Sequence, residues 1–294
     1  MHIARRTLLA AVLPWGTAAL PWGCSRRLSK VAAVVRNAGS DTMVNVAQAW
    51  AEEYAKVNAA VSVEVSGGGS ATGIAGLIDG VVDLANCSRR MEVSERARAE
   101  EKNHHGVVET IAGHDALALY VHPDNPLDEI SLEQLGRMYG RGGDVERWSQ
   151  LGISWPHGED DRILLISRQS NSGTYEYFRN SILGKRGEFR AGTRDLNGSK
   201  EVVSLIASTR AAIGYSGMGY AIEGVKTLRI KAGASAAVAP TVESAQNGTY
   251  KISRPLYIYS LEGAAAAITN YLEWILSPAG QAVVRKAGYV PLVS

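Results

Sequence analysis

The chain has 294 residues, of which 46% are hydrophobic and 20% are charged. A chain of this size can bury a sizeable core, and its length predicts two domains. Its formal net charge is only +2, and the body of the chain has no dense run of basic residues. This composition argues against a protein that binds nucleic acid, whereas a small charged ligand needs only a local positive site.

The N-terminal residues 1–24 are predicted to be an export signal. Arg5 and Arg6 precede the apolar run Thr7–Leu13, which is too short to span a bilayer as a helix. The adjacent arginines resemble a twin-arginine signal. We therefore expect an exported protein that is periplasmic or tethered to the outer face of a membrane.

Lipidation of Cys24 is one way in which the exported chain could be tethered. The sequence before Cys24 resembles a lipoprotein processing site only loosely, because Gly23 fits the pattern and the two residues before it do not. Cys87 is the only other cysteine. No disulfide is expected once Cys24 is lipidated or removed, so Cys87 is predicted to be a small buried side chain.

A first polar loop follows a predicted strand at Val31–Val35. It contains Ser40, Asp41 and Thr42, and from Met43 onward apolar residues recur at helical spacing. Free backbone N–H groups at the start of a helix can bind an anion. A plain helix cap formed by Ser40 or Asp41 is the alternative.

A second loop, Ser66–Gly73, repeats this arrangement. It follows Val61–Val65, whose alternating apolar residues predict a strand, and it contains Ser70. Apolar residues at helical spacing follow the loop, from Ile74 to Ile78. The chain thus places a second small polar loop between a strand and a helix.

Three enzyme motifs built on glycine-rich loops do not occur. A dinucleotide-binding fingerprint counted from Gly67 and a nucleophile elbow centred on Ser70 both need glycine where Thr72 stands. An elbow centred on Ser216 needs glycine where Met218 stands, and the chain has no Gly-Lys-Ser or Gly-Lys-Thr of a Walker loop. These enzyme classes therefore lose most of their support.

Two further stretches complete the pattern. The segment Gly80–Met91 predicts a short strand with Ser88 and Arg89 at its end, and we assign Arg89 to the site and Arg90 to the solvated surface. In the middle of the chain, a predicted buried strand at 162–166 leads into another polar loop and a helix. The residues of this loop that suit an anion, by positive charge, hydroxyl group or small size, are Arg168, Ser172, Gly173 and Thr174. An ordinary helix cap by Ser172, with Arg168 pointing to solvent, is the alternative.

In their order along the chain, these stretches resemble the phosphate-binding proteins of bacterial ABC phosphate transporters. The motifs are Gly-Ser-Asp-Thr-Met at 39–43, Gly-Gly-Gly-Ser-Ala-Thr-Gly at 67–73, Asp-Leu-Ala-Asn-Cys-Ser-Arg at 83–89 and Arg-Gln-Ser-Asn-Ser-Gly-Thr at 168–174. Further matches lie at 130–135, 212–215, 253–257, 276–281 and 288–291. Each motif is unspecific alone, but the ordered set covers essentially all of the chain after the signal.

The resemblance implies an α/β fold of the type II periplasmic binding class. Two lobes are joined by two crossover segments and close by a hinge around a ligand in the central cleft. We expect one lobe to combine residues 31–115 with 251–294, and the other to comprise residues 116–250. The implied protein is not an enzyme and uses no cofactor or metal. It is a monomer that captures inorganic phosphate for the permease and ATPase subunits of a transporter, without contacting nucleic acid.

The resemblance also implies individual phosphate contacts. They are Ser40, Thr42, the backbone of Met43, Ser70, Arg168, Ser172, Gly173 and Thr174. Ser88 departs from the family, because well-known members have an aspartate there that accepts the proton of hydrogen phosphate and so rejects sulfate. Asp41 is the candidate replacement, with a helix cap as its alternative role, and Arg89 is a candidate second positive charge.

Other functions stay open because of the departure at Ser88. A pocket without that acceptor could bind another tetrahedral oxyanion such as sulfate, molybdate or tungstate. A phosphate-sensing component would use the same pocket. An enzyme acting on phosphate esters would need a metal cluster or an activated nucleophile, and neither is visible in the sequence.

Overall fold

The structure is a computed structural model that describes residues 31–155 and 160–292. The predicted export signal, including Cys24, lies outside the described residues. Within them, strands alternate with helices along the chain, which confirms the prediction of an α/β fold. None of the described helices has the length and apolar character needed to cross a membrane.

The first group of strands places three of the predicted loops at one edge of a sheet. Strand β1 (Ala33–Gly39) lies between β2 (Val61–Ser66) and β3 (Leu84–Cys87) and is parallel to both. Helices α1 (Val44–Val57) and α2 (Ser70–Ile78) connect these strands. Because the three strands are parallel, the loops after their carboxyl ends meet at the same edge, as in other open α/β sheets.

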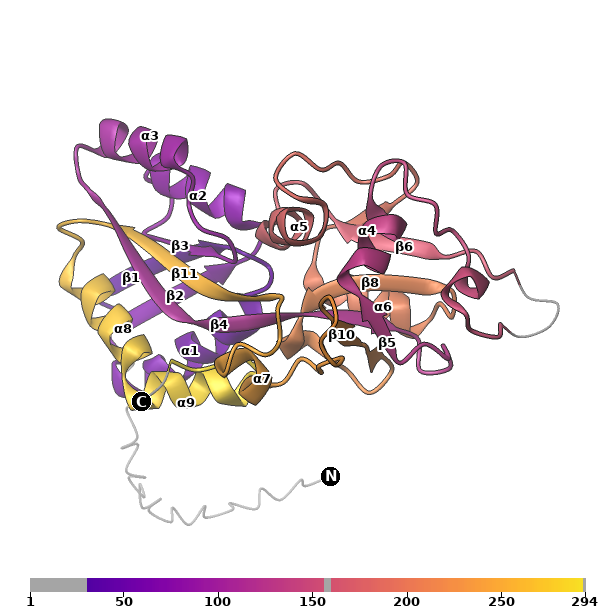
Figure 1. Ribbon diagram of the computed structural model, residues 1–294. Helices are drawn as coiled ribbons and strands as arrows, with labels where there is room; N and C mark the ends of the chain where they lie inside the picture. Colours follow the sequence, from indigo (N-terminus) through magenta and orange to yellow (C-terminus); the bar gives the residue numbers. More distant parts are fainter. Residues whose placement is uncertain (1–30, 156–159, 293–294) are drawn as a thin grey trace, which may run out of the picture. The chain divides into compact units, whose positions relative to one another are not determined.

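A long strand, β4 (Val107–Val121), joins this group to the second one. Strand β11 (Ser253–Leu261) runs antiparallel to β3 and to the first part of β4. The last part of β4, from Leu117, pairs instead with β8 (Ala212–Gly217). The strand order is β2-β1-β3-β11-β4-β8-β6-β7, and Figure 1 shows β4 passing from one group of strands into the other.

The second group of strands carries the central loop. Strand β6 (Leu164–Arg168) lies between β8 and β7 (Arg194–Leu196) and is parallel to both. Strand β9 (Lys226–Thr227) pairs with β4, and β5 (Glu129–Ser131) forms a separate small sheet with β10 (Arg229–Lys231). The central loop therefore leaves the carboxyl end of a buried parallel strand, as the sequence predicts.

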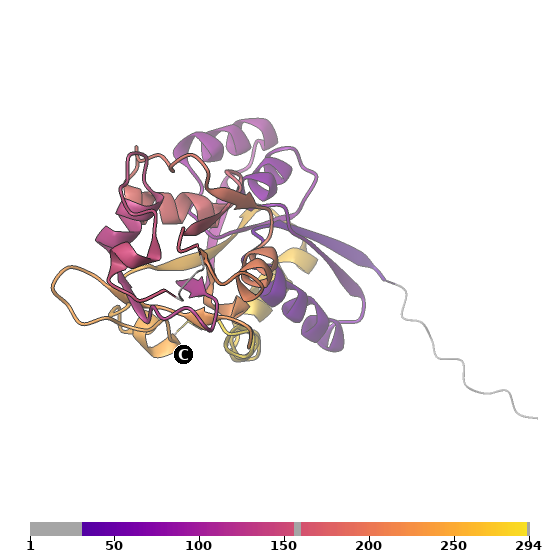
Figure 2. The same ribbon diagram turned by 90° about the vertical axis from the view of Figure 1, so that its right-hand side faces the viewer.

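Helices cover both faces of the strands. The remaining ones are α3 (Val93–Asn103), α4 (Leu132–Tyr139), α5 (Gly173–Phe178), α6 (Ser199–Ala207), α7 (Val242–Gln246), α8 (Ala266–Leu276) and α9 (Pro278–Lys286), with short helical turns at Trp148–Leu151, Arg179–Leu183 and Met218–Tyr220. Helices α2 and α3 pack on one face of the first group of strands, and α1, α8 and α9 pack on the other (Figures 1 and 2).

The hydrophobic core consists of four clusters. Two are formed by residues up to 112 and from 256 onward, and two by residues from 116 to 252. In one of the latter, Phe178 stacks on Tyr215 at 3.9 Å between ring centroids and meets the edge of Tyr139 at 4.9 Å. The residue limits of the two lobes stay a prediction. Cys87 is free and buried, as expected.

Two predicted strands are displaced toward the C-terminus. The strand expected at 31–35 begins at Ala33, where its pairing with β2 begins, and continues to Gly39. The strand expected at 162–166 covers Leu164–Arg168, because Arg168 still pairs with Leu196 of β7. The apolar runs end before the strands do, because the backbone ladders continue into the polar residues that follow.

Phe178→Ala is expected to lower the free energy of unfolding by about 3–5 kcal/mol, because it leaves a cavity against two buried tyrosine rings. Val57→Ala is the control, since Val57 is 66% exposed at the end of α1 and its truncation should change stability by less than about 0.5 kcal/mol. Both values can be measured by denaturant unfolding. Equal losses in the two variants would contradict the placement of Phe178 in the core.

Candidate functional site

Three serine side chains from three loops meet at the edge of the first group of strands. Ser40 follows β1, Ser70 begins α2, and Ser88 follows β3. The Ser40 hydroxyl donates to Ser88 Oγ at 2.8 Å, and the hydroxyl oxygens of Ser70 and Ser88 are 3.4 Å apart. The backbone N–H of Ser88 also donates to Ser70 Oγ at 3.1 Å. The structure thus brings three of the predicted residues into one buried hydroxyl cluster.

The central loop approaches this cluster through Gly173. A Cβ atom at this position would lie 2.4 Å from Ser70 Oγ and 2.8 Å from Ser88 Oγ, so a larger residue does not fit without displacement. The preceding Ser172 caps α5, because its hydroxyl accepts a hydrogen bond from the Thr174 N–H at 3.2 Å. The glycine therefore permits a close approach of the central loop to the hydroxyl cluster, while its approach to an anion stays a prediction.

Asn171 adds a second link between the central loop and the second loop. Its side-chain amide donates to the carbonyl oxygen of Gly68 at 2.9 Å. The backbone carbonyl oxygen of Asn171 accepts a hydrogen bond from the N–H of Ala71 at 3.2 Å. The two loops, which belong to different groups of strands, are therefore hydrogen-bonded to each other.

The hydroxyl groups of Thr42 and Thr174 form another contact between the two groups of strands. Their oxygens are 2.6 Å apart, and both residues are buried. Arg254 of β11 donates to both of them, at 2.9 Å to Thr174 Oγ1 and 3.4 Å to Thr42 Oγ1. Arg254 is itself paired with Asp115 of β4 at 2.9 Å. Burial raises the pKa of the Asp115 carboxyl, and the nearby Arg254 opposes this shift.

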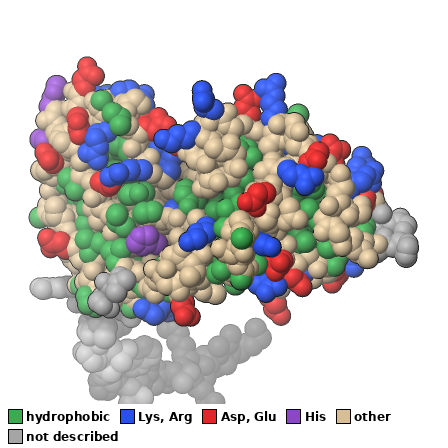
Figure 3. Space-filling model, in the orientation of Figure 1, with side chains coloured by type: hydrophobic (Ala, Val, Ile, Leu, Met, Phe, Trp, Pro, Cys, Tyr) green, Lys and Arg blue, Asp and Glu red, His purple; other side chains and the backbone are tan. Residues whose placement is uncertain are grey.

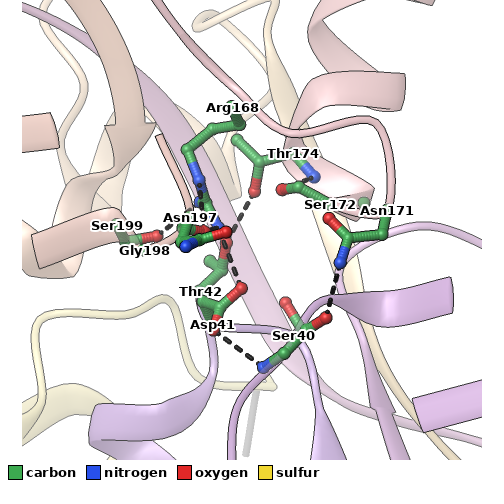
Figure 4. Close-up of polar contacts among 12 residues, drawn as sticks. Ser40, Asp41, Thr42, Arg168, Asn171, Ser172, Thr174, Asn197, Gly198 and Ser199 are labelled. Atoms are coloured by element: carbon green, nitrogen blue, oxygen red, sulfur yellow. Dashed lines mark hydrogen bonds and ion pairs between the residues drawn. The ribbon is translucent and has the colours of Figure 1, made fainter. Parts of the chain in front are cut away.

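Arg168 and Asp41 form an ion pair in which Arg168 Nη2 lies 2.9 Å from Asp41 Oδ2 (Figure 4). Arg168 also donates to Ser199 Oγ at 2.9 Å and, through Nε, to the Asn197 carbonyl oxygen at 3.1 Å. The other oxygen of Asp41 accepts from the N–H of Gly68 at 2.9 Å. Burial lowers the pKa of the Arg168 guanidinium, and the charge of Asp41 opposes that shift.

Met43 lies at the start of α1 with its side chain in the core. Its backbone N–H donates to the Ser40 carbonyl oxygen at 2.9 Å, which closes the turn that leads into the helix. The Met43 backbone therefore lies beside the hydroxyl cluster. A hydrogen bond from this backbone to an anion stays a prediction.

Arg89 contacts carboxylates from both groups of strands. Two of its nitrogens lie 2.7 Å from the two oxygens of Glu95 on α3, and its Nε lies 2.7 Å from Glu176 on α5. Burial raises the pKa of Glu176, while the charge of Arg89 opposes this shift. A direct role of Arg89 toward an anion stays a prediction. The neighbouring Arg90 is exposed and pairs with Glu109, in line with its assignment to the surface.

The site is rich in hydrogen-bond donors but not in net positive charge. Each of its three arginines is paired with a carboxylate, and Arg89 is paired with two. Figure 3 likewise shows acidic and basic side chains interspersed over the visible face. Within the described part of the chain, no group of three or more His, Cys, Asp or Glu residues could hold a metal ion. The arrangement therefore suits an anion held by hydroxyl, amide and guanidinium donors.

Arg254 and Asp115 were not predicted from the sequence as site residues. Arg254 is the one charged residue of β11, and Asp115 directly precedes the buried apolar run 116–121 of β4. A charged residue in such surroundings needs a partner of opposite charge. This pattern could have marked both residues as a buried pair. Their position beside the threonines, however, depends on the register of β11 against β4, which a single sequence does not reveal.

Comparisons with known proteins identify the family and the fold. Residues 28–279 match the family model described as a PBP superfamily domain. The chain is 34% identical over 278 residues to the phosphate-binding protein PstS of Pseudomonas aeruginosa, covering 91% of this chain and 85% of that protein. It is 31% identical over 295 residues to the protein SphX of Synechococcus elongatus, covering 96% and 85%.

A solved structure with a similar fold contains phosphate. It is a phosphate ABC transporter substrate-binding protein with bound phosphate from Clostridium perfringens, with a TM-score of 0.79 and 27% identity, covering 88% of this chain and 100% of that chain. These matches confirm the family resemblance and the fold class expected from the sequence, a two-lobe type II periplasmic binding fold.

Arg89→Met is expected to lower the free energy of unfolding by about 3 kcal/mol, because it removes the arginine partner of the buried carboxylate of Glu95 and of the partly buried one of Glu176. Arg90→Met is the matched control, since the Arg90 side chain is 72% exposed and a surface ion pair contributes little to stability. Denaturant unfolding of both variants measures the difference. Comparable losses would show that the Arg89 contacts are no stronger than a surface pair.

Glu95→Gln is expected to destabilise the protein at neutral pH but not in acid. Burial raises the pKa of Glu95, but the hydrogen bonds from Arg89 and from the Glu92 N–H outweigh burial and hold it below its ordinary value of 4.5. Such a carboxyl stabilises the fold above the unfolded-state pKa, and this contribution is lost as the pH falls through the folded-state pKa. The gap between the thermal unfolding midpoints of the two proteins should shrink below about pH 4. A gap that widens in acid would contradict the lowered pKa.

Proposed function

The chain belongs to the PBP superfamily and, within it, to the family of the PstS phosphate-binding proteins, and on this premise we propose that it captures inorganic phosphate between two lobes and delivers it to an ABC transporter. The observation that carries the proposal is that hydrogen-bond donors from four loops converge. These loops belong to two different groups of strands. Neutral donors together with a guanidinium group can hold a dehydrated anion by charge-assisted hydrogen bonds. The protein acts as a receptor, without catalysing a reaction.

The lobes in this proposal comprise residues 31–115 with 251–294, and residues 116–250. The first lobe supplies Ser40, Thr42, the backbone of Met43 and Ser70, and the second supplies Arg168, Ser172, Gly173 and Thr174. Two contacts between these sets support the assignment, namely the approach of Gly173 to Ser70 and the hydroxyl contact between Thr42 and Thr174. Ser88 orients the neighbouring serine hydroxyls, and Arg89 adds positive charge at the edge of the site.

Asp41 is proposed as the group that distinguishes phosphate from sulfate. Near neutral pH, phosphate carries at least one proton that a carboxylate can accept, whereas the sulfate dianion has none and is repelled. One Asp41 oxygen accepts from Arg168 and the other from Gly68. Each carboxylate oxygen can accept two hydrogen bonds, so both retain the capacity for one more.

The proposed receptor acts outside the cytoplasm and delivers phosphate to transporter subunits that are separate proteins. The N-terminal residues direct export, Cys24 is the candidate lipid anchor, and the monomer with bound phosphate meets the permease of a transporter driven by ATPase subunits. A role in phosphate sensing would use the same bound state. The basis of this part of the proposal is the family membership and the character of the N-terminal sequence.

Binding of another tetrahedral oxyanion is the second candidate function. The observation that favours it is Ser88, a hydroxyl group where well-known relatives carry a carboxylate. If Asp41 is fully occupied by Arg168 and Gly68, the site contains donors only and would accept sulfate, molybdate or tungstate. The two candidates therefore differ in what Asp41 does, and they share the remaining contacts.

Titration calorimetry with phosphate and sulfate tests the proposal, using the exported form of the protein freed of bound anion by unfolding and refolding. We expect tight phosphate binding without sulfate heat. Arg168→Ala should weaken phosphate binding about 100-fold because it removes charge-assisted hydrogen bonds, whereas Arg162→Ala, whose side chain is 72% exposed, should leave it unchanged within about twofold.

The variant Asp41→Asn separates the two candidates in the same experiment. If Asp41 accepts the phosphate proton, the amide should weaken phosphate binding and allow sulfate to bind. Tight sulfate binding by the unaltered protein with phosphate excluded would contradict the phosphate assignment. The donor site itself would be contradicted if the protein bound neither anion.

A further inference from the structure

Arg254 and Asp115 form a buried ion pair between the two strands that join the lobes. They are direct partners in the register of β11 against β4, and both side chains are at most 2% exposed. The guanidinium group is also held by the ring of Tyr177, whose centroid is 5.1 Å from Arg254 Cζ, and it donates to the Gly173 carbonyl oxygen at 3.3 Å. The position of this charge is therefore fixed on several sides.

The contact of Arg254 with the two threonines determines which hydrogen bonds their hydroxyl groups accept and which they donate. Guanidinium has only donors, so the oxygen of Thr174 must accept from Arg254 at 2.9 Å. The Thr42 and Thr174 oxygens are 2.6 Å apart, so one hydroxyl donates to the other. Two hydroxyl groups carry two protons, and only one of them is used in this contact.

The second hydroxyl proton has no acceptor in the described part of the chain. The hydrogen bonds of the two threonine hydroxyls there are those to each other and to Arg254. Whichever threonine donates to its partner, the other one presents a free O–H group. The positive charge behind the pair repels the hydroxyl protons and strengthens their donation away from Arg254.

We infer that Arg254, held by Asp115, is a positioning residue that turns the Thr42 and Thr174 hydroxyls into obligatory donors and so selects an anionic ligand. This inference rests on the proposed function, in which these two hydroxyls contact phosphate. Arg254 acts through the threonines and need not touch the anion. Without it, either hydroxyl could rotate to present a lone pair, which repels an anion.

A double-mutant cycle in phosphate affinity tests the inference. Arg254→Gln and Thr174→Val should each weaken phosphate binding about tenfold, measured by titration calorimetry on the exported form of the protein. Because Arg254 acts through the hydroxyl, the double variant should be no weaker than the weaker of the two single variants. Thr174→Ser, which retains the hydroxyl, should keep the affinity of the unaltered protein and remain sensitive to Arg254→Gln.

Two matched controls separate this role from a general loss of structure. Arg90→Gln removes an exposed arginine, and Thr110→Val removes a threonine hydroxyl from β4, at a distance in sequence from the loops. Neither should change phosphate affinity. If Arg254→Gln leaves Asp115 unpaired and does not fold, Asp115→Asn combined with Arg254→Gln replaces it in the cycle, since this pair buries two neutral amides.

The outcomes are distinct from those for the proposed function. Absence of phosphate binding by the unaltered protein contradicts the proposed function and the inference with it. Phosphate binding in which the effects of Arg254→Gln and Thr174→Val multiply in full, to about a hundredfold, contradicts the inference alone. An unchanged affinity in Arg254→Gln contradicts it as well.

Discussion

The pairing of β11 with β4 is the interaction on which the rest of the structure depends. Strand β4 hydrogen-bonds to β11 over its first part and to β8 over its last part, so the backbone ladders of both groups of strands share it. The same register sets Arg254 opposite Asp115 at the point where the partner changes. A slip of β11 by one residue would turn Arg254 to the other face of the sheet, away from Asp115. The register therefore fixes both the connection of the lobes and the charge beneath the threonines.

Charge pairing explains how such a site can attract an anion without being strongly basic. An unpaired buried guanidinium would be costly to fold, and each arginine of the site has a carboxylate partner that offsets this cost. The pairing keeps the protein stable when no anion is bound. It also makes the arginines sources of directed hydrogen bonds rather than of net charge. Under the proposed function, selectivity then depends on which oxygens of the ligand can accept or donate, and less on its total charge.

Much of this arrangement could be predicted from the sequence, but only where the information is local. The loops after β1, β2 and β6 were predicted because an apolar run precedes each of them and helical spacing follows it. The positions of Ser88 and Arg89 after β3 were predicted from the preceding apolar run alone. The resemblance to a known family then supplied the roles of the loop residues. The strand ends at Gly39 and Arg168 were displaced because backbone pairing with a neighbour, rather than side-chain hydrophobicity, decides where a strand stops.

Contacts between residues that lie far apart along the chain could not be predicted from the sequence. The partners of Arg89 are Glu95, six residues away, and Glu176, on a helix of the second group of strands. The first could be guessed from sequence proximity, but the second depends on how the central loop approaches the first lobe. The same holds for Arg254, which lies 80 residues from Thr174 and 212 from Thr42. Side chains of this kind are positioned by the fold as a whole, so their roles appear only once the sheet is assembled.

The contacts between lobes that bypass the hydroxyl site bear on how a receptor of this kind responds to its ligand. The Arg89–Glu176 ion pair and the Asn171–Gly68 hydrogen bond join the two groups of strands through atoms outside the hydroxyl cluster. A ligand shifts a conformational equilibrium only by its differential affinity for the two states. Contacts that do not involve the ligand raise its apparent affinity, because less of its binding energy is spent on closure, but they also reduce the difference between the free and bound forms. A receptor that must signal its bound state to a transporter therefore gains from keeping such contacts few and exchangeable with water, as the partial exposure of Glu176 allows.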